Sequence, residues 1–295
     1  MSKNAVVFGA SGQLGVELCA ELRRRGHKVF NYERGRIDIT SAEQVESALA
    51  GLDPAWVFNA AAYNQVDVAE QEPRAAFEAN GLAVRNLALA CRQSDARLIH
   101  FSTDYVFDGA LGRPYVETDE THPLGAYAVS KLAGELYARA YSASALVIRT
   151  SGVFGPGAVN TRRGNFPELM LRLARDGKPI RVVEDHVASP TFAPALAGRS
   201  IDLVERGLTG VFHLGGGEPR SWFEFARLIF RKAGIENADL KPTNEREYRT
   251  VAVRPKFSAL ANERLKDTGI AAMPPLDEAV EEYLRLRSVA RAQVK

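Results

Sequence analysis

The chain has 295 residues, 46% of them apolar, and a formal net charge of +2 from 38 Lys and Arg against 36 Asp and Glu. This composition can bury a full core, and the scattered, balanced charges argue against nucleic-acid binding or a membrane-surface stripe. We expect a cytoplasmic protein without a membrane span, because the sequence shows neither a signal sequence nor an apolar run near 18 residues. Cys19 and Cys91 lack metal-ligand spacing, so we expect structural thiols and no metal site.

A short apolar strand at residues 5–8 leads into a glycine-rich turn and then into leucines at helical spacing. Glycines let the backbone approach a pyrophosphate closely, and the free N–H groups at a helix start attract anions. The spacing is Gly-x-x-Gly-x-x-Gly rather than the commoner Gly-x-Gly-x-x-Gly, so a plain turn is the alternative. The turn predicts a dinucleotide phosphate site made by Gly9, Ser11, Gly12, Gln13 and Leu14.

The loop after a second strand, at residues 28–30, is where the adenosine ribose of a dinucleotide would lie. Glu33 would accept a hydrogen bond from a free ribose 2′-hydroxyl, whereas Arg34 and Arg36 would pair with a 2′-phosphate. We predict NADPH as the cofactor, with NADH as the alternative. A capping box at residues 40–43 opens the next helix, and the cofactor residues that we expect before it are Arg34, Asp38 and Ile39.

A third strand, at residues 55–58, ends in small side chains that leave room for the cofactor, namely Ala60, Ala61 and Ala62. A helical pattern covers residues 76–93, and another strand begins at Leu98. This alternation of strands and helices predicts a doubly wound parallel sheet.

Tyr127 and Lys131 lie four residues apart at the head of a helical pattern, so both fall on one helix face. An ammonium group about 4 Å from a phenol would favour the phenolate by roughly 4 kcal/mol at an effective dielectric near 20. We therefore predict that Lys131 lowers the pKa of Tyr127, which acts as a general acid. Thr103, just past a strand, could hold the same reacting oxygen. Alone, the Tyr–Lys pair could also arise by chance.

Taken together, these motifs resemble the extended short-chain dehydrogenase/reductases, and more closely the dTDP-4-dehydrorhamnose reductase family. The motifs that carry the resemblance, in chain order, are the glycine turn, Asn59-Ala60-Ala61, Val66-Asp67-x-Ala69-Glu70, Ser102 to Gly109, Tyr127 to Glu135, Asn165-Phe166 and Ser189-Pro190-Thr191. The resemblance implies a Rossmann-type α/β fold with a smaller α/β substrate-binding lobe. It also implies a catalytic triad of Thr103, Tyr127 and Lys131, supported by Asn80.

The resemblance divides the chain into a dinucleotide-binding domain at residues 1–154, with a returning segment near 190–215, and an interleaved substrate-binding lobe at residues 155–295. Tyr127 and Lys131 would also bind the cofactor. A homodimer is one assembly that fits the resemblance. The substrate-binding residues that it implies are Thr103, Asp104, Tyr105, Val106, Phe107, Asn165, Pro190 and Thr191.

Gly152 departs from the pattern, because many members of the family carry a tryptophan there that lines the sugar pocket. We therefore expect a roomier sugar pocket. Trp222 is expected to lie on the face of its helix that packs into the core. His186 would have a binding role only through its neighbours. Arg254 could meet a diphosphate or remain solvated.

The resemblance implies NAD(P)H-dependent reduction of the 4-keto group of a nucleotide-activated 6-deoxyhexose, foremost dTDP-4-dehydro-L-rhamnose to dTDP-L-rhamnose. Another dTDP-4-keto-6-deoxysugar is an alternative substrate. A second class of function stays open, since the regulatory subunit of methionine adenosyltransferase shares the resemblance and serves as a binding partner.

Overall fold

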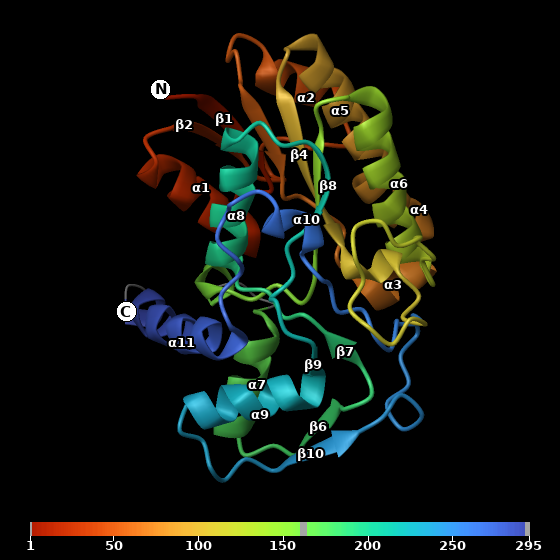
Figure 1. Ribbon diagram of the computed structural model, residues 1–295, viewed down its shortest axis with the longest axis vertical. Coiled ribbons are helices and arrows are strands. Elements are labelled where there is room, and N and C mark those ends of the chain that lie inside the picture. Colours follow the sequence, from red (N-terminus) through yellow and green to blue (C-terminus); the bar gives the residue numbers. More distant parts are fainter. Residues whose placement is uncertain (1, 160–163, 293–295) are drawn as a thin grey trace.

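The computed structural model describes residues 2–159 and 164–292, and Figure 1 shows two parts, one built on a central sheet and a smaller one below it. The sheet is entirely parallel, with the strand order β2-β1-β3-β4-β5-β8. The doubly wound fold class predicted from the sequence is confirmed. Its strands are β1 (Asn4–Phe8), β2 (Lys28–Tyr32), β3 (Trp56–Asn59), β4 (Arg97–Thr103), β5 (Leu146–Thr150) and β8 (Gly210–His213).

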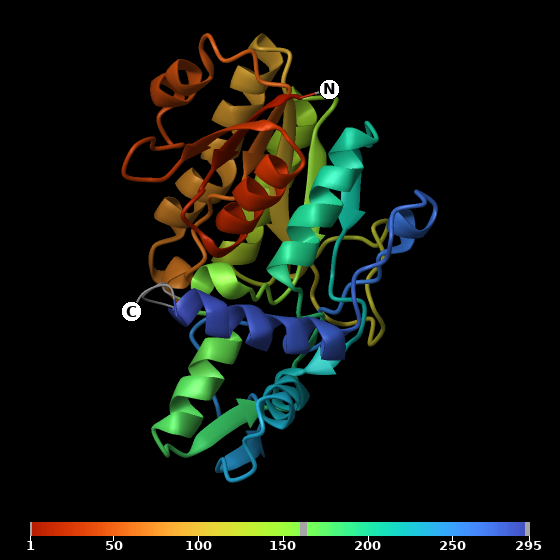
Figure 2. The same cartoon turned by 90° about the vertical axis from the view of Figure 1, so that its left-hand side faces the viewer.

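Helices cover both faces of this sheet because its strands are apolar on both sides. Val7 of β1 faces one layer, which contains α1 (Gln13–Arg24) and α8 (Ala193–Glu205). Val6 and Phe8 face the opposite layer, which contains α2 (Ala42–Leu49), α5 (Ala83–Gln93) and α6 (Ala126–Tyr141). Figures 1 and 2 show the two layers on either side of the sheet.

The helix expected at residues 76–93 is interrupted. It consists of α4 (Pro73–Phe77), a π-helical turn (Glu78–Leu82) and α5, and the short α3 (Val66–Gln71) precedes it. A Cβ atom at Gly134 of α6 would lie 2.2 Å from the backbone oxygen of Asn80, so only glycine lets α6 pack this closely on the turn. π-turns inside helices occur often at functional sites.

The smaller part has its own core, in which Phe154, Phe225 and Tyr283 are fully buried. It contains two small sheets, and α11 lies across the junction with the larger part (Figure 2). Its elements are α7 (Phe166–Arg175), β6 (Ile180–Val183), β7 (Val187–Ala188), β9 (Arg220–Ser221), α9 (Trp222–Lys232), β10 (Leu240–Thr243) and α11 (Leu276–Ala292). The sequence analysis did not predict β10, which pairs in parallel with β6.

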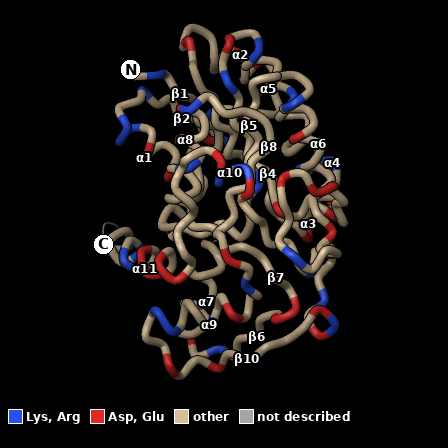
Figure 3. The backbone as a smooth tube through the Cα atoms, in the orientation of Figure 1, with Lys and Arg blue, Asp and Glu red and all other residues tan. Residues whose placement is uncertain are grey.

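The chain crosses between the two parts more than once. After β7, α8 and β8 return to the main sheet, and α10 (Glu263–Lys266) packs beside β8. The segment after β5 includes a short 3₁₀ turn (Pro156–Ala158), while residues 160–163 lie outside the described residues. Basic and acidic residues are interspersed over both parts (Figure 3). Within the described ranges, no helix combines the length and apolarity needed to cross a membrane.

Candidate active site

Thr103 ends β4, and its buried side chain belongs to a polar cluster centred on Asp104. Asp104 accepts hydrogen bonds from the hydroxyls of Thr103 (3.1 Å), Ser151 (2.8 Å) and Ser258 (2.5 Å). Burial raises the pKa of Asp104 to about 6, because three neutral donors only partly offset the lost hydration of its charge. The predicted substrate residue Asp104 therefore directs its carboxylate at protein hydroxyls.

Tyr127 lies in the first turn of α6, with its ring 6.1 Å from that of Tyr105 in an edge-on arrangement. Burial raises the pKa of Tyr127 above its usual value, and a hydrogen bond with Thr103 opposes this rise only in part. Asp104 adds to the rise because its negative charge disfavours a phenolate nearby. The phenol is thus held protonated, in the state that a general acid needs before it reacts.

Lys131 is buried one helical turn after Tyr127, and its Nζ donates to the backbone oxygen of Phe101 at 2.6 Å. Burial lowers the pKa of Lys131 to about 8. The prediction that Lys131 lowers the pKa of Tyr127 is wrong for this geometry, because burial of the phenol outweighs other effects and the ammonium is turned to a carbonyl. Asn80 donates to Ser130 Oγ (3.0 Å) and accepts from the Tyr63 N–H (2.8 Å), which joins the π-turn to α6.

The glycine turn lies between β1 and α1. Gly9 has φ +76°, and a Cβ atom there would stand 2.5 Å from the N atom of Ala61, so the turn touches the backbone after β3. Among the described residues, no side chain caps the start of α1, and the first turn of this helix holds no acidic residue. Its amide groups are therefore available to an anion. Ser11 is exposed, and Leu14 and the chain at Ala60 to Ala62 are partly buried beside this turn.

Gln13 has a role that the sequence did not reveal. Its Nε2 donates to Val153 O (2.8 Å), and its Oε1 accepts from Asn165 Nδ2 (2.9 Å). Asn165, predicted to bind substrate, caps α7 by accepting from the Glu168 N–H at 3.0 Å. The two side chains thus connect the cofactor turn to the smaller part of the molecule.

The expected ribose loop follows β2. The guanidinium of Arg36 lies 5.4 Å from the centre of the Tyr32 ring. Arg34 is exposed, and its positive charge helps to lower the pKa of Asp38. Asp38 accepts from the N–H and hydroxyl of Thr40 (3.0 and 2.8 Å), and hydrogen bonding to Thr40 lowers its pKa. Ile39 is buried against the sheet.

A cavity of about 350 Å³ opens beside Tyr105, between the two parts of the chain. Tyr105 joins it to Tyr127 through the ring contact already described. Arg254 lies in its wall and forms a two-pronged ion pair with Asp67 at 2.7 and 3.0 Å. The lining residues are Asp67, Tyr105, Phe166, Leu169, Met170, Arg181, Val182, Val183, His186, Trp222, Glu245, Tyr248, Thr250 and Arg254.

Several predicted substrate residues lie away from this cavity. Val106 and Phe107 are fully buried in a small core cluster, where Phe107 stacks on Tyr115 at 4.1 Å. Of the turn after β4, Tyr105 is the residue that lines the cavity, so the substrate contacts expected of Val106 and Phe107 stay a prediction. Thr191 is fully buried and donates to Ser189 O at 2.8 Å, and Pro190 packs behind Gly152.

The space beside Gly152 is filled rather than open. Gly152 has φ +51°, and a Cβ atom there would lie 3.2 Å from Cη2 of Trp222 and 3.3 Å from Cα of Pro190. Trp222 packs edge-on against Phe166 at 4.8 Å and against the core of the smaller part, as predicted, and it also lines the cavity. The sequence could not show this, because Trp222 belongs to a helix distant in sequence from Gly152.

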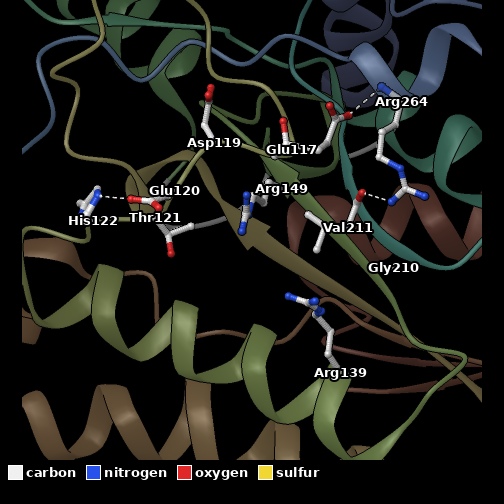
Figure 4. A pocket seen from close by; sticks show the side chains of 11 residues that line it. Glu117, Asp119, Glu120, Thr121, His122, Arg139, Arg149, Gly210, Val211 and Arg264 are labelled. Carbon is white, nitrogen blue, oxygen red and sulfur yellow. Dashed lines mark hydrogen bonds and ion pairs between the residues drawn. The ribbon is translucent and has the colours of Figure 1, made fainter.

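A second, more open hollow of about 700 Å³ lies at the outer edge of β8 (Figure 4). The Arg264 guanidinium donates to the backbone oxygen of Val211 there, and the Arg264 backbone N–H donates to the Glu117 carboxylate at 3.3 Å. None of the residues predicted for catalysis or cofactor binding lines this hollow. Of the predicted substrate residues, Tyr105 lines the smaller cavity instead.

Known proteins are similar to this chain over most of its length. The family model of the RmlD substrate binding domain matches residues 3–288. The spore coat polysaccharide biosynthesis protein SpsK of Bacillus subtilis is 36% identical, covering 97% of this chain and 98% of its own. A dTDP-4-dehydrorhamnose reductase of Streptomyces griseus is 38% identical over 90% of this chain and 88% of its own. The crystal structure of a dTDP-4-dehydrorhamnose reductase from Bacillus anthracis with NADP has a TM-score of 0.91 and 32% identity, over 97% and 99% of the two chains.

Proposed function

This chain belongs to the family of the RmlD substrate binding domain, and from that membership we propose that it is an NADPH-dependent dTDP-4-dehydrorhamnose reductase. The reaction reduces the 4-keto group of dTDP-4-dehydro-L-rhamnose and gives dTDP-L-rhamnose. The observation that carries the proposal is the ring contact of Tyr127 with Tyr105, which lines the cavity between the two parts of the chain.

The cofactor supplies a hydride to carbon 4 of the sugar when it is bound. Tyr127 would give its proton to the 4-oxygen, and the Thr103 hydroxyl would turn from Asp104 to hold that oxygen. Lys131, whose pKa of about 8 leaves it mostly charged at neutral pH, would bind the nicotinamide ribose. The amide groups at the start of α1 would hold the pyrophosphate, with Gly9, Ser11, Gly12, Gln13 and Leu14 around it.

Residues 1–154 with the returning α8 and β8 would bind the cofactor, and residues 155–295 would supply most of the substrate cavity. The lining of the cavity supports this division, since most of its residues come from beyond residue 155. Arg181 offers a guanidinium group that suits phosphate oxygens. We propose cytoplasmic localisation, which the two buried free thiols support. A homodimer stays a prediction, which light scattering on the purified protein would test.

The decisive experiment is NADPH oxidation, followed by absorbance, over a panel of dTDP-4-keto-6-deoxysugars. We expect the highest kcat/KM with dTDP-4-dehydro-L-rhamnose. A tenfold preference for an epimeric or amino-substituted sugar would replace that substrate and leave the reductase assignment standing. Binding of NADPH and dTDP without turnover of any sugar would favour the regulatory alternative.

A further inference from the structure

A group of metal-ligating side chains lies at the cavity, whose wall includes two of its members, His186 and Glu245. Asp185 and His186 follow β6, and Glu245 follows β10. One ligand atom from each of these three residues lies within 4.8 Å of the other two. The sequence predicted no metal site, because Glu245 is far from Asp185 and His186 along the chain.

The parallel pairing of β6 with β10 brings the three residues together. Val183 pairs with Thr243 at the carboxyl ends of these strands, and the Glu184 N–H donates to Thr243 O at 2.9 Å. One step further, the Glu245 N–H donates to both carboxylate oxygens of Asp185, each at 3.2 Å. The backbone therefore positions the two acidic residues independently of the Glu245 side chain.

His186 is the observation that points to a ligand. Its side chain is only 8% exposed, and its buried Nε2 has no hydrogen-bond partner among the described residues. Its backbone oxygen accepts from the Trp222 N–H at 3.2 Å, so the residue is fixed against the start of α9. A buried imidazole nitrogen without a partner is unfavourable, and it becomes favourable when a cation takes its lone pair.

Charge in the cavity wall points the same way. Asp185 has no ion-pair partner within 4 Å in the part of the chain that is described, and Arg254 is committed to Asp67. Glu245 pairs with Lys256 at 3.2 Å, but the Lys256 side chain is 63% exposed, so this pair is weak. A diphosphate entering the cavity would meet these carboxylates, and a divalent cation would relieve the repulsion.

We propose that Asp185, His186 and Glu245 form a site for a divalent cation. One nitrogen and two carboxylate ligands suit Mn²⁺, Co²⁺ or Zn²⁺, and three protein ligands leave coordination positions open to the cavity. In a second part of the proposal, which rests on the proposed function, oxygens of the nucleotide-sugar diphosphate fill the open coordination positions of the cation.

The test is a calorimetric titration of the chelator-treated full-length protein with MnCl₂ and with ZnCl₂. Two variants remove a ligand, His186→Gln and the more conservative Glu245→Gln, whose backbone contact to Asp185 is retained. His122→Gln is the matched control, because exposed His122 faces a single carboxylate, Glu120, at 3.6 Å. Circular dichroism and thermal melting check that each variant is folded.

We expect one bound ion per chain, a loss of affinity of about tenfold or more in both ligand variants, and no change in the control. No uptake by the parent protein, or parent-like affinity in either folded ligand variant, would overturn the site.

A second titration in the presence of dTDP tests the diphosphate step. The affinity for Mn²⁺ should rise about fivefold or more, because coupling between two ligands is reciprocal. An unchanged affinity would overturn the bridge to the diphosphate. These readouts do not depend on turnover, so a failure of the reductase assignment would be recognised separately, by the absence of NADPH oxidation.

Discussion

The indole ring of Trp222 packs against Gly152 on the side where any other residue would carry its Cβ atom. A Cβ atom built there would lie 3.2 Å from Cη2 of Trp222. The glycine therefore marks a place where an aromatic ring from α9 already forms the pocket wall. Any side chain at residue 152 would need both a strained backbone at φ +51° and movement of that ring.

The first prediction follows from this contact. Gly152→Trp should lower kcat/KM for the 4-keto sugar by tenfold or more and lower the melting temperature, because two indole rings cannot share the space. The double variant Gly152→Trp/Trp222→Ala should recover part of the activity, and Trp222→Ala alone serves as the reference. Higher activity in the single Gly152→Trp variant would show that the pocket is roomy there and that Trp222 yields easily.

Tyr127→Phe tests the proton donor. The change removes one hydroxyl from a buried site, so turnover should fall by about 10² to 10⁴ while NADPH affinity, measured by fluorescence titration, stays within a factor of three. Tyr137→Phe is the matched control, because Tyr137 lies on the same helix and contacts Tyr141 instead of the catalytic cluster. Turnover above a tenth of the parent value would exclude Tyr127 as the general acid.

Asp104→Asn tests the buried carboxylate through the pH dependence of stability. The pKa of Asp104 is raised from 3.8 to about 6, so the folded state binds more protons than the unfolded state between these values. Its contribution to stability is present below pH 4 and is lost as the pH rises through 6, by about 3 kcal/mol in all.

Urea unfolding of the parent and of Asp104→Asn at pH 4 and pH 7 measures this contribution. Between these pH values the parent should lose stability relative to the variant, because asparagine does not ionise. Ser151→Ala is the control, since it removes one hydrogen-bond donor and leaves the carboxylate in place. A pH-independent difference between parent and Asp104→Asn would show that Asp104 has an ordinary pKa.

Arg34→Ala tests how the 2′-phosphate is recognised. The KM for NADPH should rise about tenfold and the KM for NADH should change little, because only the phosphate loses a charged partner. Arg24→Ala is the control, since exposed Arg24 lies on α1 and pairs with Glu21 at 2.6 Å. Equal losses with both cofactors would mean that Arg34 does not contact a 2′-phosphate.

The sequence alone determined the parallel sheet, the glycine turn at the start of α1, and the placement of Thr103, Tyr127 and Lys131 around one strand end and one helix turn. These features depend on the alternation of strands and helices, on backbone freedom at Gly9, and on side chains four residues apart in a helix. All of them act over short stretches of chain, so a local pattern is enough to predict them.

Tertiary structure alone decided the direction of each side chain at the site. Packing buries Val106 and Phe107 in a small core cluster. It also brings Asn165 within hydrogen-bond distance of Gln13 and places Trp222 against Gly152. The pairing of β6 with the unpredicted β10 brought Glu245 to Asp185 and His186. The Lys131 ammonium donates to Phe101 O. Burial raises the pKa of Tyr127, and burial depends on the whole fold rather than on the spacing of the two residues along the helix.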